Sequence, residues 1–193
     1  MASKSDPKPN FSLASPPGGR SVRRFQEADR GFSNMYWAPV AWGDEVTPIG
    51  LWPMNELPYV LAKTPLAAQR DEGMALFREA ERTAPGSGGM AIYRWGKGLI
   101  VRSDWYAVRD AVMLALVRDK FARNRALGEL LLATGEGLIE EGNDWGDLYW
   151  GVALGDDPER GIKAGSGRNR LGEILMQVRG ELRRGEAHLA AAL

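Results

Sequence analysis

Apolar residues recur at helical spacing in several segments of this chain, and glycine, proline and polar residues separate these segments. The clearest segment follows Ser103, and its apolar residues are three to five positions apart, on one face of a helix: Trp105, Val108, Val112, Leu116 and Phe121. Other helices are predicted from about 55 to 64, 65 to 82, 125 to 134, and 169 to 182. Ser103, Asn55 and Asn169 are the expected N-caps, and residues 84–89 are expected to form a flexible connection.

Between Phe25 and Leu51 the pattern changes to aromatic residues and short breaks, with a turn signal at Gly43-Asp44. This pattern predicts a small antiparallel hairpin. Together the segments predict an α+β fold that is predominantly α-helical and has a small antiparallel β element. A length of 193 residues suits one domain, which we place at residues 23–193, after a flexible N-terminal arm at residues 1–22.

Composition narrows the possible chemistry. The chain has no cysteine and a single histidine, His188, which excludes a disulfide framework and a cysteine zinc site and argues against a Ser-His-Asp relay. Catalysis would therefore use carboxylates, lysine, arginine, tyrosine or backbone dipoles. No apolar run approaches the ~18 residues of a membrane span, and no signal peptide is evident, so we expect a soluble, cytoplasmic protein without a membrane partner.

Charge is unevenly distributed although the formal net charge is zero. Residues 1–24 carry five basic residues and one acid, whereas residues 136–159 carry eight acids and neither lysine nor arginine. One interpretation is ordinary solvated surface, and the other is an acid-lined cleft with a basic rim for phosphates. The basic arm could add weak, salt-sensitive contact with a polyanion.

Glu56 and Lys63 lie seven residues apart in a predicted helix, so they share nearly one face about 10 Å apart along the axis. In the first turn, the helix dipole would lower the pKa of Glu56, which suits a base or a stabiliser of a cation. Lys63 could bind a phosphate, hold a ribose, or attack its anomeric carbon to form an imine. The alternative is a pair of surface residues at the helix ends.

Two later segments combine acids, aromatics and glycines. Asp147 lies between Trp145 and Trp150, which suits a flat base and sugar hydroxyls, or equally a turn whose tryptophans pack in the core. Arg168 and Asn169 open the last predicted helix, where free amides and guanidinium groups favour an anion. Plain helix capping is the alternative there.

The order of these motifs resembles the NADAR family, also called YbiA-like, over residues 25 to 184. The motifs that carry the resemblance are Phe32-Ser33-Asn34, Glu56-x-x-Tyr59-x-x-x-Lys63, Trp95-Gly96-Lys97, Arg102-x-Asp104-Trp105, Arg109-x-x-Val112-Met113, Lys120-Phe121-x-x-Asn124, Leu131-Leu132-x-Thr134-Gly135, Asp147-x-x-Trp150-Gly151, Gly167-x-Asn169-x-Leu171-Gly172 and Leu175-Met176-x-x-Arg179. The chain departs from the family at Leu57, where the family usually has a histidine after its glutamate, and at Pro58.

The resemblance implies an N-glycosyl hydrolase without a metal or organic cofactor. The implied substrate is ADP-ribosylated guanine in nucleic acid, and its partner is then an ADP-ribose-type nucleotide or ADP-ribosylated nucleic acid. The alternatives are hydrolysis of ribosylamino-pyrimidine phosphates of riboflavin synthesis, a non-catalytic module that binds ADP-ribose or another nucleotide, and an interaction protein that has kept only the fold. Matched by position, the expected catalytic residues are Glu56, Lys63 and Asp147. The expected substrate-binding residues are Asn34, Tyr59, Arg102, Trp105, Trp150, Gly151, Arg168 and Asn169.

Overall fold

The computed structural model describes residues 18–186, so His188 and most of the predicted arm lie outside the described residues. Its elements, in chain order, are a 3-10 helix η1 (Glu27–Phe32), β1 (Val40–Trp42), β2 (Gly50–Trp52), α1 (Glu56–Leu61), α2 (Ala67–Thr83), α3 (Gly88–Trp95), a 3-10 helix η2 (Gly96–Gly98), α4 (Trp105–Arg123), α5 (Arg125–Leu132), β3 (Gly142–Asn143), β4 (Val152–Ala153) and α6 (Arg170–Arg183). The helices predicted from apolar periodicity are confirmed as α1, α2, α4, α5 and α6. The predicted class, mostly helical with a small antiparallel β element, is confirmed as well.

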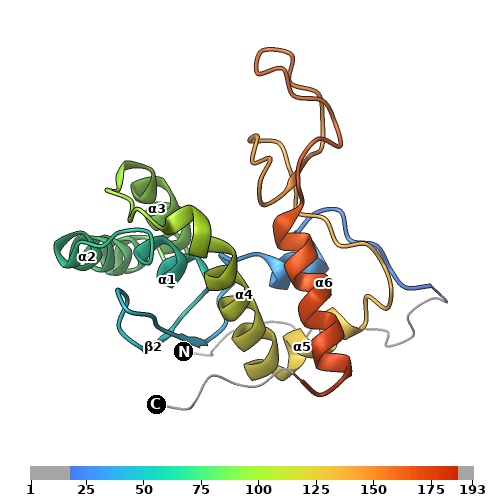
Figure 1. The fold of residues 1–193 in the computed structure, drawn as a ribbon, viewed down its shortest axis with the longest axis horizontal. Coiled ribbons are helices and arrows are strands. Elements are labelled where there is room, and N and C mark those ends of the chain that lie inside the picture. Colours follow the sequence, from blue (N-terminus) through green and yellow to red (C-terminus); the bar gives the residue numbers. More distant parts are fainter. Residues whose placement is uncertain (1–17, 187–193) are drawn as a thin grey trace, which may run out of the picture.

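Helix α4 runs between two groups of helices, with α1, α2 and α3 on one side and α5 and α6 on the other (Figure 1). Its predicted apolar face is buried at Trp105, Val112, Leu116 and Phe121, and packs in a core with residues of α5 and α6. A second apolar cluster joins α1, α2 and α3. No helix of the described chain, α4 included, is long and apolar enough to cross a membrane.

The predicted hairpin is confirmed. Strands β1 and β2 pair antiparallel, with Ala41 opposite Leu51, and Asp44 Oδ1 accepts hydrogen bonds from the amides of Val46 and Thr47 in the turn. Strands β3 and β4 form a parallel pair that was not predicted. Each has two residues, which is too short for an alternating pattern to be visible in the sequence.

Two details of the helix ends correct the sequence predictions. The Asn55 side chain makes no cap hydrogen bond and instead donates to Asn34 Oδ1, and α4 begins after Asp104 rather than directly after Ser103. Gly88 and Gly89 belong to α3 and not to a flexible connection. A glycine-rich sequence reads as a linker, yet here the missing side chains let α3 pack closely on α2, because a Cβ on Gly88 would lie 2.6 Å from the Phe77 ring.

The first described residues pack onto the domain. Val22 is buried and donates its amide to the carbonyl of Leu138, while its own carbonyl accepts from the amide of Glu140. Arg20 forms an ion pair with Asp29. Residues 18–22 are therefore part of the packed structure, and a flexible arm stays a prediction for the residues before them.

Gly73→Ala is expected to destabilise the protein by about 1–3 kcal/mol, because an added Cβ would lie 2.7 Å from the Trp95 ring and 2.9 Å from the Leu61 side chain. This cost exceeds the ~1 kcal/mol that alanine gains over glycine in a helix. Urea denaturation measures the change. Gly180→Ala in α6 is the control, since only the end of the Arg184 side chain lies near it, 3.3 Å away. An unfolding midpoint of Gly73→Ala at or above that of the wild type would contradict the packing argument.

Candidate functional site

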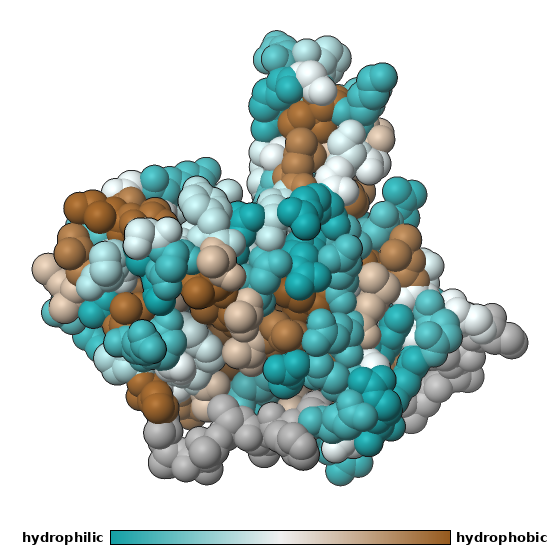
Figure 2. All heavy atoms as spheres, in the orientation of Figure 1, coloured by the Kyte–Doolittle hydropathy of each residue, from teal (hydrophilic) through white to brown (hydrophobic). Residues whose placement is uncertain are grey.

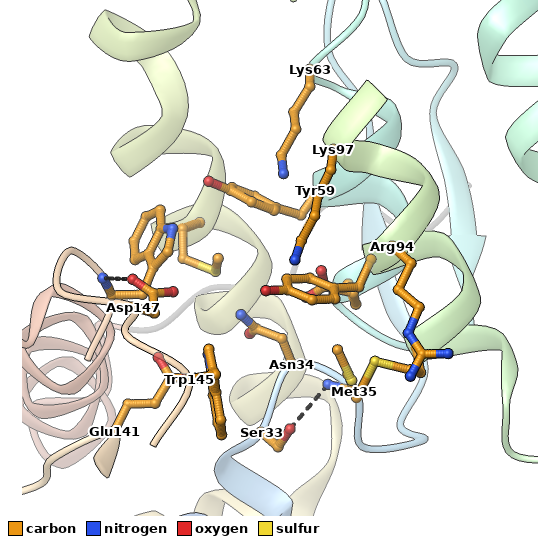
Figure 3. A pocket seen from close by; sticks show the side chains of 15 residues that line it. Ser33, Asn34, Met35, Tyr59, Lys63, Arg94, Lys97, Glu141, Trp145 and Asp147 are labelled. Atoms are coloured by element: carbon orange, nitrogen blue, oxygen red, sulfur yellow. Dashed lines mark hydrogen bonds between the residues drawn. The ribbon is translucent and has the colours of Figure 1, made fainter. Parts of the chain in front are cut away.

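A cavity of about 510 Å³ opens between α3 and the loop that joins β3 to β4, and the 33–35 loop and α1 also line it (Figure 3). Its volume lies in the usual range of small-molecule sites. Six of the residues predicted from the sequence line it: Asn34, Glu56, Tyr59, Lys63, Asp147 and Trp150. Five lining residues that were not predicted as site residues carry charges or aromatic rings: Tyr93, Arg94, Lys97, Glu141 and Trp145.

Buried hydrogen bonds fix the 33–35 loop. Lys120, which is fully buried on α4, donates from Nζ to the carbonyl of Ser33 at 2.7 Å, and burial lowers the pKa of Lys120 to about 7. The amide of Glu56 donates to the carbonyl of Asn34 at 3.0 Å. The loop and the start of α1 therefore hold each other in place, which sets the position of Asn34 beside Glu56.

Glu56 is the most deeply buried of the predicted catalytic groups, with 8% of its surface exposed. Burial raises the pKa of its carboxyl to about 7; the charge of Lys63 opposes this shift, and that of Asp147 adds to it. The expectation that the helix dipole would lower this pKa is wrong. Helix α1 has only six residues, and the loss of water around the carboxylate outweighs its dipole.

Lys63 follows α1, and its Nζ lies 5.2 Å from the centre of the Tyr59 ring. Burial lowers the pKa of Lys63, while the charges of Glu56 and Asp147 oppose that shift. The Tyr59 ring is itself held between Trp105 and Trp150, with ring centres 5.1 and 5.7 Å away. The Lys63 amine thus loses its proton at a lower pH than usual, and the Glu56 carboxyl keeps its proton to a higher pH than usual. Such shifts are typical of groups that act in proton transfer or nucleophilic attack.

Asp147 is held by its own turn. Its Oδ1 accepts hydrogen bonds from the amides of Tyr149 and Trp150, and Asn143 Oδ1 accepts from the amide of Asp147. The turn thus presents Asp147 and Trp150 to the cavity, and core packing of the tryptophans applies only to Trp150, which packs against the core. Trp145, with 52% of its surface exposed, lines the same side (Figure 3).

Glu141 adds a third carboxyl group to the cavity. Burial, together with the charges of Asp147 and Glu56, raises its pKa to about 8. The sequence showed it only as one of eight acids in residues 136–159, and irregular structure there gave no periodicity to indicate which of them points inward. No group of three or more Asp, Glu, His or Cys between residues 18 and 186 is arranged to hold a metal ion.

Helix α3 and the short helix η2 that follows it carry a basic wall, with Arg94 on α3 and Lys97 on η2. Arg94 and Lys97 line the cavity, and neither has an ion pair or hydrogen bond from its side chain to any residue of the described chain. Lys97 Nζ lies 4.7 Å from the centre of the Tyr93 ring. Figure 3 shows these two side chains across the cavity from Glu141, Trp145 and Asp147. Two acids and two tryptophans thus face two cations across the cavity. Glu141 and Asp147 agree with the acid-lined interpretation, but the basic groups lie on α3 and η2.

Five predicted substrate-binding residues do not line this cavity. Arg102 is held by Asp44 and Asp104, Trp105 packs in the core, and Gly151 is buried in the turn before β4. Arg168 lies over the Tyr149 ring, on the exposed surface. A substrate contact by these residues stays a prediction that no geometry of the cavity supports.

The fifth of these residues, Asn169, supports the site from behind. Its backbone is left-handed, with φ of 52°, and it makes no side-chain cap hydrogen bond at α6. Its Oδ1 accepts from the amide of Glu141 at 3.0 Å, and its Nδ2 donates to the carbonyl of Ile139 at 2.8 Å. Asn169 therefore holds the strand-like segment that brings Glu141 to the cavity.

Asn169→Ala is expected to destabilise the protein by about 2–4 kcal/mol. It removes two hydrogen bonds, and alanine tolerates the left-handed backbone conformation less well than asparagine does. Asn169→Gly removes the same bonds but tolerates the backbone, so its loss should be smaller. Urea denaturation compares the two variants. If Asn169→Ala unfolds at the same urea concentration as the wild type, these two hydrogen bonds do not hold the segment in place.

Leu57, at which the resemblance leads one to expect a histidine, is buried in the second apolar cluster with Phe77 and Ile92. It does not line the cavity. Pro58 lies in the first turn of α1, where its missing amide costs no hydrogen bond. This departure from the family pattern therefore affects packing around α1 and leaves Glu56 and Lys63 at the cavity.

Comparisons with known proteins agree with this architecture. A riboflavin biosynthesis protein of Vibrio vulnificus is 46% identical over 81 residues, which are 42% of this chain and 19% of that protein. The N-glycosidase YbiA of Escherichia coli is 37% identical over 82 residues, 42% of this chain and 45% of YbiA. These matches span less than half of either relative.

The solution structure of E. coli YbiA superposes with a TM-score of 0.62 at 26% identity, over 90% of this chain and 93% of that one. The family model described as the NADAR domain matches residues 22–183. Because this match covers most of the sequence, the chain belongs to the NADAR domain family.

Proposed function

We propose that this protein is an N-glycosidase that hydrolyses the bond between ribose C1' and the nitrogen of a base, and that ADP-ribosylated guanine in nucleic acid is its substrate. The observation that carries the proposal is the joint placement of Glu56, Lys63 and Asp147 in one cavity with tryptophans. The name of the E. coli relative, N-glycosidase YbiA, supports the same class of reaction.

Cleavage of a C1'–N bond develops positive charge on the ribose ring. An ionised carboxylate in a water-poor cavity stabilises such charge more strongly than it would in water. Glu56, buried in the cavity and ionising near pH 7, is suited to this role or to activating the attacking water. Asp147 Oδ2, which has no hydrogen-bond partner among residues 18–186, is available to a ribose hydroxyl.

Lys63 would engage the ribose. Its lowered pKa increases the fraction of neutral amine, which can hydrogen bond to the sugar or attack C1' of its ring-opened form. In its protonated form, Lys63 instead places a positive charge close to Glu56, and this charge favours the ionised carboxylate.

The walls of the cavity support a substrate with an anionic part and a flat part. Arg94 and Lys97 offer unpaired cations to phosphate groups, and the faces of Trp145 and Trp150 suit a purine or pyrimidine. Both ADP-ribosylguanine and a ribosylamino-pyrimidine phosphate have these two parts. The relative named for riboflavin biosynthesis makes the pyrimidine phosphate the second candidate substrate.

Incubation of the protein with guanine-ADP-ribosylated DNA, and separately with ribosylamino-pyrimidine phosphates, tests the proposal when products are followed by mass spectrometry. Release of ADP-ribose supports the nucleic-acid substrate, and release of ribose phosphate from the second compound supports the metabolite. Binding of either compound without release would instead indicate a non-catalytic binding module.

Lys97→Met is expected to raise KM by about tenfold for either phosphorylated substrate, because one charge-assisted hydrogen bond to phosphate is lost. The control is Lys163→Met, which changes an exposed lysine that does not line the cavity. Equal KM values for the two variants would mean that the phosphates bind elsewhere.

A further inference from the structure

One oxygen of the Glu141 carboxyl group is buried without an evident structural purpose. Its Oε2 is inaccessible to water and has no hydrogen-bond partner among the described residues. Leaving such a group unpaired costs about 1–3 kcal/mol, so a buried, unpaired carboxyl that lines a cavity needs an explanation. Asp147 differs from it, because two backbone amides already satisfy one oxygen of Asp147.

The backbone holds Glu141 firmly at this place. Asn169 Oδ1 accepts from its amide at 3.0 Å, and its carbonyl accepts from the amide of Val152 at 3.0 Å. These two bonds come from the segments at β4 and α6, so the side chain is presented by a rigid frame. A positioned group of this kind meets the geometric requirement for proton transfer to a bound molecule.

Glu141 also lies on the side of the cavity that suits a base. Figure 3 shows it next to Trp145 and near Asp147, across the cavity from Arg94 and Lys97. If the phosphates of the substrate bind the cations of α3 and η2, and the ribose meets Glu56 and Lys63, the base then lies against the wall of Trp145 and Trp150. The nitrogen that leaves C1' is therefore brought to the side of Glu141.

We propose that Glu141 is the proton donor to the leaving nitrogen base, an inference that rests on the N-glycosidase function proposed above. The C1'–N bond breaks, its electron pair goes to the nitrogen, and the proton on the Glu141 carboxyl moves to that nitrogen. Water then forms the new bond to C1', and its released proton returns to the Glu141 carboxylate. Glu56 stays ionised throughout and stabilises the charge on the ribose.

The charges around Glu141 favour this division of roles. Asp147 on the adjacent loop and Glu56 on α1 both disfavour an ionised Glu141. Lys63 after α1, Arg94 on α3 and Lys97 on η2 are the cations that line the same cavity. The pKa of Glu141 is raised to about 8 and that of Glu56 to about 7. The charge of Lys63 favours the ionised form of Glu56, whereas every charge acting on Glu141 is that of an acid and favours its protonated form.

The pH dependence of kcat for the full-length wild type, Glu141→Gln and Glu141→Asp tests this inference. Proton donation contributes about 10²–10⁴ in rate, so Glu141→Gln should lower kcat by at least about 100-fold. It should also remove the fall in rate on the alkaline side, which in the wild type reports deprotonation of Glu141. Glu141→Asp retains a proton donor and should retain the alkaline fall. Glu72→Gln, an exposed glutamate of α2, is the matched control.

The outcomes separate this inference from the proposed function. If the wild type cleaves one of the two substrates and Glu141→Gln keeps both its rate and its alkaline fall, Glu141 is not the donor although the N-glycosidase function stands. If the wild type releases neither ADP-ribose nor ribose phosphate, the function itself fails. A thermal unfolding curve of Glu141→Gln near that of the wild type excludes loss of the fold as the cause of a lower rate.

Discussion

Glu56→Gln is expected to lower kcat by about 100- to 1,000-fold, because the amide cannot supply the negative charge that stabilises the positive ribose or activates water. The substitution keeps the size of the side chain and the backbone bond to Asn34. Steady-state release of ADP-ribose at pH 8, where the wild-type carboxyl is mostly ionised, measures the effect. Glu72→Gln on the exposed side of α2 should retain the wild-type rate.

The stability of the same variant should change in the opposite direction. The folded-state pKa of Glu56 lies above the usual value of a glutamate, so the folded protein binds more protons than the unfolded chain between about pH 4.5 and 7. The contribution of Glu56 to the free energy of unfolding is therefore present at low pH and is lost as the pH rises through its folded-state pKa. Glu56→Gln is therefore expected to be more stable than the wild type at pH 8 by about 1–3 kcal/mol. A less stable variant at pH 8 would contradict the burial argument.

Lys63→Met is expected to lower kcat/KM by at least about 100-fold, because methionine keeps an unbranched apolar stem of similar size but removes the amine that engages the ribose. The pH profile provides a second readout. Since the charge of Lys63 lowers the pKa of Glu56, its removal should move the acid limb of the profile to higher pH.

Lys163→Met is the control for the loss of one lysine, because Lys163 is exposed and lies outside the cavity. An unchanged acid limb in Lys63→Met would show that Lys63 and Glu56 do not act on each other in solution. Unchanged turnover would remove Lys63 from the catalytic residues.

The helical part of the fold was predictable because its signal is local. The buried stripe on α4 follows from residue spacing alone, and Gly43-Asp44 marks the hairpin turn. Helix α3 was not predicted, since Gly88 and Gly89 read as a linker unless one knows that Phe77 lies against them. Missing α3 also meant missing the basic wall of the cavity, and the phosphate contacts were instead expected at Arg102 and Arg168.

The site residues were predictable where the family motifs matched. They were less predictable where tertiary structure decides which side chains face the cavity and how their pKa values shift. Glu56, Lys63, Asp147 and Trp150 were named from the sequence and lie together. The direction of the Glu56 pKa shift was not predictable from its place in a helix, because burial by other segments dominates it. Glu141 looked like any other acid in its segment, and its inward position depends on hydrogen bonds with residues about ten and thirty positions away.

The most direct test of the proposed chemistry is a time course of ADP-ribose release from a guanine-ADP-ribosylated oligonucleotide by the wild type and by Glu56→Gln at equal concentration, followed by mass spectrometry. Release of ADP-ribose and unmodified guanine DNA by the wild type, with at least about 100-fold slower release by folded Glu56→Gln, is the expected result. Equal rates for the two proteins would contradict the role of Glu56. A wild type that leaves this oligonucleotide intact would contradict the proposed substrate.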